Sequence, residues 1–84
     1  MRLPRDLSGA ELAKKLEIFG YHITRQTGSH LRLTSERGGE HHITIPQHKD
    51  LRVGTLNVIL TDIAEHLDIS REELISELFG KKIE

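Results

Sequence analysis

The sequence contains no cysteine and no tryptophan, and only one tyrosine and two phenylalanines. Because disulfides and thiolate metal sites need cysteine, neither can form here. No apolar run approaches the roughly 20 residues of a membrane helix, and the first residues lack the apolar stretch of a secretion signal. We therefore expect one domain over residues 1–84, located in the cytoplasm and built around a single hydrophobic core.

The formal net charge is only −1, but charge is unevenly distributed along the chain. Residues 21–52 carry five Lys and Arg against three acidic residues, whereas residues 53–84 carry three basic residues against seven acidic ones. Because salt screens electric fields over about 10 Å, a ligand at the middle segment would feel mainly the local charge. The pattern permits an RNA partner, although a solvated surface with scattered charges would show it too.

A capping-box pattern marks the start of the first predicted helix. Ser8 and Glu11 have the spacing at which a hydroxyl and a carboxylate satisfy free amides at a helix N-terminus. Apolar residues then recur at spacings of three and four as far as Phe19. Gly20 follows and can take the left-handed conformation that ends a helix. The pattern predicts a helix over residues 9–19.

Two further helices are predicted in the C-terminal half. The clearest apolar stripe of the chain runs through residues 56–67, and Thr55 precedes it as a good N-cap residue. Ser70 and Glu73 repeat the capping-box spacing and predict a last short helix, which Gly80 closes.

Three short strands are predicted between the first helix and the second. Runs of strand-forming residues are separated by a Thr-Gly-Ser turn and by a loop with two glycines, and a proline stops the third run. The predicted strands span residues 21–26, 30–34 and 41–45, with the turn at 27–29, the loop at 36–39 and the proline at 46.

The second predicted strand shows which side chains face the core. Leu31 and Leu33 alternate with His30 and Arg32. Successive side chains of a strand point to opposite sides, and burying each leucine is worth about 2 kcal/mol, so the leucines should face inward. His30 and Arg32 then share the opposite face, where they meet solvent or a ligand.

The order of elements predicts an α+β fold of two layers, with helices packed on one face of a small antiparallel sheet. Binding or chemistry would then occur on the uncovered face of the sheet. Double-stranded RNA-binding domains have the same α-β-β-β-α order, here extended by a short C-terminal helix. Such domains read the shape of A-form RNA through its phosphates and 2′-hydroxyls.

Three short motifs follow the predicted first helix, and their order and spacing resemble those of the HicA toxin family over about residues 8–60. The motifs are Gly28-Ser29-His30, then Ile45-Pro46-x-His48-Lys49, then Leu51-x-x-Gly54-Thr55-Leu56-x-x-Ile59-Leu60.

The resemblance implies a toxin of a toxin–antitoxin module, a ribonuclease acting on mRNA, with a HicB-type antitoxin that covers its active site. It also implies that the family's catalytic histidine is His30. The match at Gly54 and Thr55 is interpreted as structural, because a glycine and a capping hydroxyl suit a helix start. Leu33 departs from the family, many members of which have an aromatic residue there. With few aromatics for base stacking, contacts to phosphates and 2′-hydroxyls should dominate.

The expected chemistry suits a histidine. RNA is cut without a metal when its own 2′-hydroxyl attacks the adjacent phosphate while an imidazole moves protons near neutral pH. Cationic side chains must then stabilise charge on the phosphate. We expect proton transfer by His30 and phosphate binding by Arg32 and Lys49. The remaining candidate RNA-binding residues are Gly28, Ser29, His48 and Arg25.

Some of these residues have other interpretations. Gly28 could serve only a turn that needs a positive φ. Ser29 and His30 should point to opposite faces, which argues against a nucleophilic pair. The same alternation separates His41, which is expected to be partly buried at the sheet edge, from the polar His42. With no cysteine to complete a site, we expect no metal.

Two other functions remain open at this point. A non-catalytic RNA-binding module of the same fold would use Arg25, Arg32, Lys49 and Arg52, and would not need His30 as a proton carrier. A protein-interaction domain would use the open sheet face to bind a partner and would show no salt-sensitive RNA binding.

Overall fold

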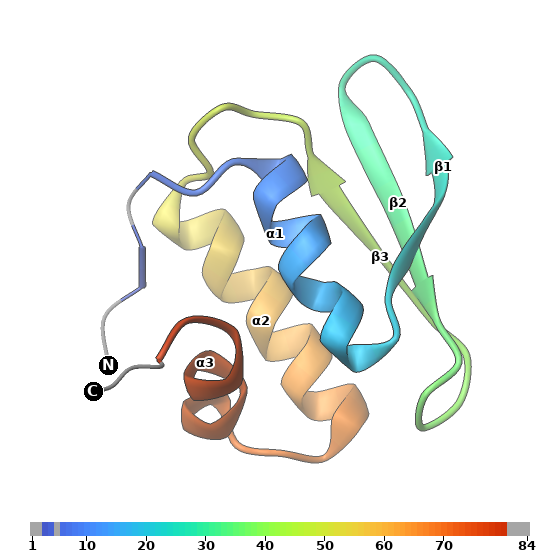
Figure 1. The fold of residues 1–84 in the computed structure, drawn as a ribbon, viewed down its shortest axis with the longest axis vertical. Coiled ribbons are helices and arrows are strands. Elements are labelled where there is room, and N and C mark those ends of the chain that lie inside the picture. Colours follow the sequence, from blue (N-terminus) through green and yellow to red (C-terminus); the bar gives the residue numbers. More distant parts are fainter. Residues whose placement is uncertain (1–2, 5, 81–84) are drawn as a thin grey trace.

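The computed structural model describes residues 3–4 and 6–80, and it has the predicted α+β architecture. Figure 1 shows α1 and α2 on one side of a three-stranded antiparallel sheet, with α3 packed against α2. The sheet order is β1-β2-β3. The elements are α1 (Gly9–Lys15), the 3₁₀ helix η1 (Leu16–Phe19), β1 (His22–Gln26), β2 (His30–Ser35), β3 (His41–Pro46), α2 (Val53–Leu67) and α3 (Arg71–Phe79).

The predicted capping box at the start of α1 is confirmed. Ser8 Oγ accepts from the Glu11 amide at 3.0 Å, and Glu11 Oε1 accepts from the Ser8 amide at 2.9 Å. These bonds favour the charged carboxylate and lower the pKa of Glu11. The stabilisation they give is therefore present above the ordinary pKa of a glutamate and is lost as the pH falls. At its other end the helix tightens into η1, and Gly20 (φ +85°) ends it as predicted.

Helix α2 begins at Val53, three residues before the predicted start, so the prediction that Thr55 caps it is wrong. The N-cap is Arg52, in an extended conformation and without a side-chain cap. Tertiary structure sets this start. Leu51 is buried and its amide donates to the Leu7 carbonyl at 2.7 Å, which holds Leu51 outside the helix. The helix begins two residues later, and Thr55 falls inside its first turn.

The core lies between the sheet and the helices. In the β2–β3 register Leu31 pairs with Ile45 and Leu33 with Ile43, and all four side chains are buried. His30 and Arg32 alternate with the two leucines along β2 and are exposed on the other side of the sheet, as predicted.

The last helix packs against α2 through one face. Ser70 Oγ accepts from the Glu73 amide at 3.0 Å, as predicted, and Leu74, Ile75 and Leu78 are buried.

No helix in the described part of the chain is long and apolar enough to cross a membrane.

The start of α1 makes a close backbone contact with the end of β3. A Cβ atom added at Gly9 would lie 2.1 Å from the Pro46 carbonyl oxygen, far inside van der Waals contact. The Gly9 amide also donates to the His48 carbonyl at 3.0 Å. Only glycine therefore lets α1 approach the sheet this closely.

We predict that Gly9→Ala lowers the free energy of unfolding by about 1–3 kcal/mol, because α1 must move away from Pro46. Urea denaturation followed by circular dichroism measures the change. Gly54→Ala is the matched control, since nothing lies within 4 Å of its added Cβ and alanine is the better helix former. Equal stability of Gly9→Ala and wild type would contradict the close contact.

Candidate functional site

The uncovered face of the sheet carries the polar side chains of all three strands. Cross-strand partners share a face, so Arg32 on the central strand lies between Arg25 of β1 and Thr44 of β3. Two residues from Arg32 along β2, His30 lies opposite Pro46. The side chains of Arg25, Arg32 and His30 are exposed.

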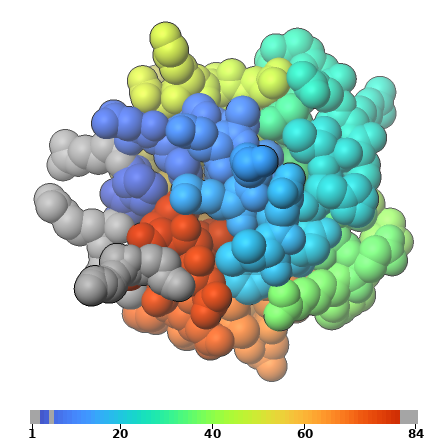
Figure 2. Space-filling model, in the orientation of Figure 1, coloured from blue at the N-terminus to red at the C-terminus, as the bar shows by residue number. Residues whose placement is uncertain are grey.

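A hydrogen-bonded turn fixes the backbone of His30. The Thr27 amide donates to the His30 carbonyl at 2.9 Å, and the His30 amide donates to Thr27 Oγ1 at 3.0 Å. The Gln47 amide donates to the Ser29 carbonyl at 2.8 Å, which ties this turn to the loop after β3. Figure 2 shows the two segments side by side at one end of the molecule.

Ser29 contacts the imidazole of His30, contrary to the prediction that the two side chains point apart. Ser29 Oγ lies 2.9 Å from His30 Nδ1. The prediction was wrong because strand alternation does not apply to Ser29, which lies in the turn just before β2 begins. With Nδ1 engaged, Nε2 is the ring nitrogen that stays available to a ligand on this exposed side chain. When Nδ1–H donates to Ser29, Nε2 carries the lone pair that accepts a proton.

Gly28 does not serve a left-handed turn. The glycines with positive φ in the described residues are Gly20, Gly38 and Gly39, so that interpretation of Gly28 is wrong. A Cβ atom added at Gly28 would meet nothing within 4 Å. The surface beside His30 is therefore open, and a ligand can approach the backbone of the turn.

His48 and Lys49 lie apart from the arginines, in the loop that follows β3. Both are exposed, and with Ser8, Ala10 and Gln47 they line a shallow hollow beside the start of α1. The site predicted from sequence therefore has two parts. His30, Arg32 and Arg25 occupy the open face, and the loop residues flank the end of the sheet nearest Ser29.

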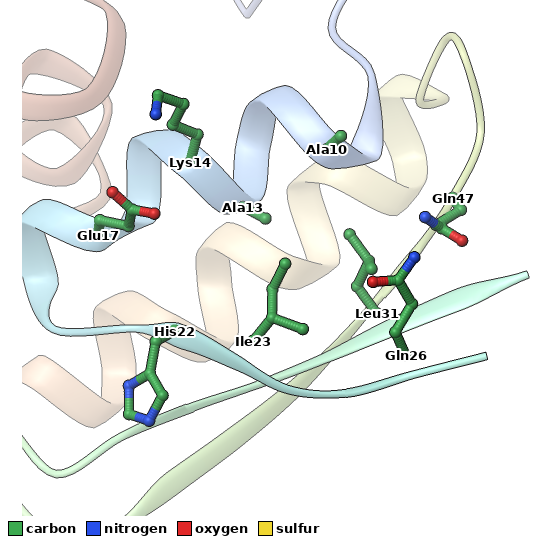
Figure 3. Close-up of a pocket in the computed structure, with 9 residues that line it drawn as sticks. All are labelled: Ala10, Ala13, Lys14, Glu17, His22, Ile23, Gln26, Leu31 and Gln47. Carbon is green, nitrogen blue, oxygen red and sulfur yellow. The ribbon is translucent and has the colours of Figure 1, made fainter.

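A groove between α1 and β1 lies on the covered side of the sheet. Figure 3 shows Ile23 and Leu31 directed toward the helix, with Gln26 and Gln47 at one end of the groove. None of the residues predicted to bind or cut RNA lines it. The residues that line it are Ala10, Ala13, Lys14, Glu17, His22, Ile23, Gln26, Leu31 and Gln47.

Sequence reasoning missed a polar cluster behind β3. Tyr21 Oη lies 2.6 Å from His41 Nδ1, and His41 Nε2 lies 3.2 Å from Asp62 Oδ1. The His41 ring stacks on His66, with centroids 4.2 Å apart. Burial, and secondarily the charge of Asp62, raises the pKa of Tyr21 to about 12. The sequence signal was present on α2, because Asp62 and His66 are four residues apart and so share one helix face.

This cluster joins β3 to α2 and leaves no nitrogen of His41 free for catalysis. His41 is partly buried, as predicted, and His42 lies on the open face. In the described residues no three His, Asp or Glu side chains are gathered as a metal site requires. The absence of a metal remains a prediction.

The comparison with protein families identifies the class of protein. The model of the family described as the HicA toxin of bacterial toxin–antitoxin systems matches residues 9–64. This range covers most of the chain, from α1 through most of α2, and contains every candidate site residue. The chain therefore belongs to the HicA toxin family and is a toxin whose partner is an antitoxin. No curated protein matches it, and no solved structure does.

The single tyrosine gives a test of the cluster behind β3. Because its pKa is raised from 10.0 to about 12 in the folded protein, its contribution to stability is complete below pH 10 and is lost as the pH rises toward 12. We predict that the difference in unfolding free energy between wild type and Tyr21→Phe shrinks above pH 10, by at most about 1.4 kcal/mol per pH unit. Denaturation curves between pH 8 and 11 measure it. A difference in unfolding free energy between wild type and Tyr21→Phe that stays constant from pH 8 to 11 would contradict the raised pKa of Tyr21.

Proposed function

We propose that this toxin is a metal-independent ribonuclease that cuts mRNA in the cytoplasm, with His30 as the proton-transfer residue. One observation carries the proposal. An exposed imidazole, oriented through Nδ1 by Ser29, lies on the same sheet face as two arginines. A base positioned by a second group and placed near cations is the arrangement that phosphodiester cleavage needs.

In the proposed reaction the RNA 2′-hydroxyl attacks the adjacent phosphorus, and Nε2 of His30 takes the hydroxyl proton. A bond forms between the 2′-oxygen and phosphorus while the bond from phosphorus to the 5′-oxygen breaks. The leaving oxygen takes a proton from water, and the hydroxide that remains takes the proton back from the imidazolium, which restores neutral His30. The products are a 2′,3′-cyclic phosphate and a 5′-hydroxyl. The guanidinium of Arg32 stabilises negative charge that builds on the phosphate.

The other candidate residues hold RNA in this proposal. Ser29 orients His30, and Gly28 leaves room for the backbone of the nucleic acid at the turn. His48 and Lys49 contact RNA that extends past the end of β3, since their loop is joined to Ser29 through Gln47. These contacts involve phosphate and sugar rather than stacked bases, so we expect weak sequence preference.

The test uses purified protein, a labelled single-stranded RNA and a chelator in the buffer. We predict that His30→Ala and His30→Gln lower the cleavage rate about 10²- to 10⁴-fold and leave RNA affinity and unfolding free energy close to wild type. His22→Gln is the matched control, because His22 is also exposed on the sheet and lies at its other end.

Three outcomes separate the possible functions. Full cleavage by a folded His30→Ala variant would overturn the catalytic role of His30. RNA binding without cleavage by wild type would leave the non-catalytic RNA-binding module. Absence of salt-sensitive RNA binding would instead indicate a protein-interaction domain.

A further inference from the structure

A β-bulge in β1 determines the face on which Arg25 lies. The β1–β2 register pairs Ile23 with Leu33 and then Arg25 with Arg32, so Thr24 is an extra residue. Regular alternation would have put Arg25 on the same face as Ile23, toward the helices. The extra residue shifts the register by one and moves Arg25 to the open face.

The result is two arginines directly opposite each other on adjacent strands. Like charges in such positions repel, which makes this pairing unfavourable by itself. Both ion pairs in the part of the chain that the structure describes involve a histidine, so no carboxylate neutralises Arg25 or Arg32 there. An anion bound between the two guanidinium groups would remove the repulsion.

Hydrogen bonds hold the bulge in place. Thr24 Oγ1 lies 2.9 Å from Thr34 Oγ1 and donates to the Arg32 carbonyl at 3.3 Å. Thr34 Oγ1 in turn lies 2.8 Å from His42 Nδ1, and His42 Nε2 lies 2.9 Å from Glu40 Oε2. The extra residue is thus bonded to the central strand and, through it, to β3. A bulge held in this way keeps Arg25 beside Arg32 before any ligand arrives.

The spacing between the arginine pair and His30 is close to the spacing of successive phosphates along a nucleic-acid strand. Arg32 follows His30 by two residues on β2 and shares its face, which places the two Cα atoms about 7 Å apart. Successive phosphates along one RNA strand have a comparable spacing.

We propose that Arg25 and Arg32 form a phosphate site next to the cleavage position, and that Thr24 is the positioning residue that builds it. Arg32 lies next to both His30 and Arg25, so in this proposal it contacts the phosphate that is cut and, together with Arg25, binds the phosphate adjacent to it. The RNA strand then runs along β2. The identification of the bound anion as an RNA phosphate rests on the proposed function. The pairing of Arg25 with Arg32 across the two strands does not depend on that function.

The experiment measures the affinity of a ten-nucleotide, 2′-O-methylated RNA, which cannot be cleaved, at several salt concentrations. We predict that Arg25→Gln weakens binding about tenfold and reduces the slope of log affinity against log salt by about 0.7, the value for one phosphate on a single strand. Thr24→Val should produce most of this loss. Thr44→Val, which also lies opposite Arg32, is the matched control and should change neither quantity.

A double-mutant cycle tests whether Thr24 acts through Arg25. We predict that Thr24→Val has no further effect in the Arg25→Gln protein, and that Thr24→Ser, which keeps the hydroxyl, binds like wild type. Equal effects of Thr24→Val in both backgrounds would overturn the positioning role. Thr24→Ala replaces Thr24→Val in the cycle if the valine variant fails to fold.

The outcomes distinguish this site from the proposed ribonuclease. If wild type cleaves RNA but Arg25→Gln binds with unchanged affinity and salt slope, the phosphate site is wrong and the ribonuclease stands. If wild type never cleaves but the predicted losses of binding appear, the phosphate site stands without catalysis.

Discussion

Burial of Leu31 and Leu33 beneath α1 and α2 is the constraint on which the rest of the structure depends. It fixes which side of the central strand meets the helices, and so fixes the side on which His30 and Arg32 appear. A shift of one residue in the pairing of β2 would expose both leucines and bury both polar side chains, at a cost of several kcal/mol. Hydrophobic packing thereby determines the position of the proposed chemistry.

Two irregularities of the β1–β2 hairpin then shape the open face. The turn before His30 brings Ser29 onto its ring, and the bulge at Thr24 brings Arg25 beside Arg32. Regular strands would supply neither contact. The family match places this hairpin inside the domain of a toxin that has an antitoxin partner.

Most of the fold could be predicted from local patterns, because apolar stripes and alternation report directly on which side chains are buried. The same patterns gave the faces of His30 and Arg32. They could not give the start of α2, which depends on a hydrogen bond between Leu51 and the distant Leu7. Nor could they give the bulge at Thr24, since extra residues in a strand are set by cross-strand pairing and not by sequence period.

We propose that RNA binds the uncovered face of the sheet and not the helical side. Mapping backbone amide chemical-shift changes by NMR, while a non-cleavable single-stranded RNA is titrated into the protein, tests it most directly. The structure predicts the largest changes in residues 24–32 and 42–49, with small changes in α3. Changes concentrated on α2 and α3, with β2 unaffected, would contradict it.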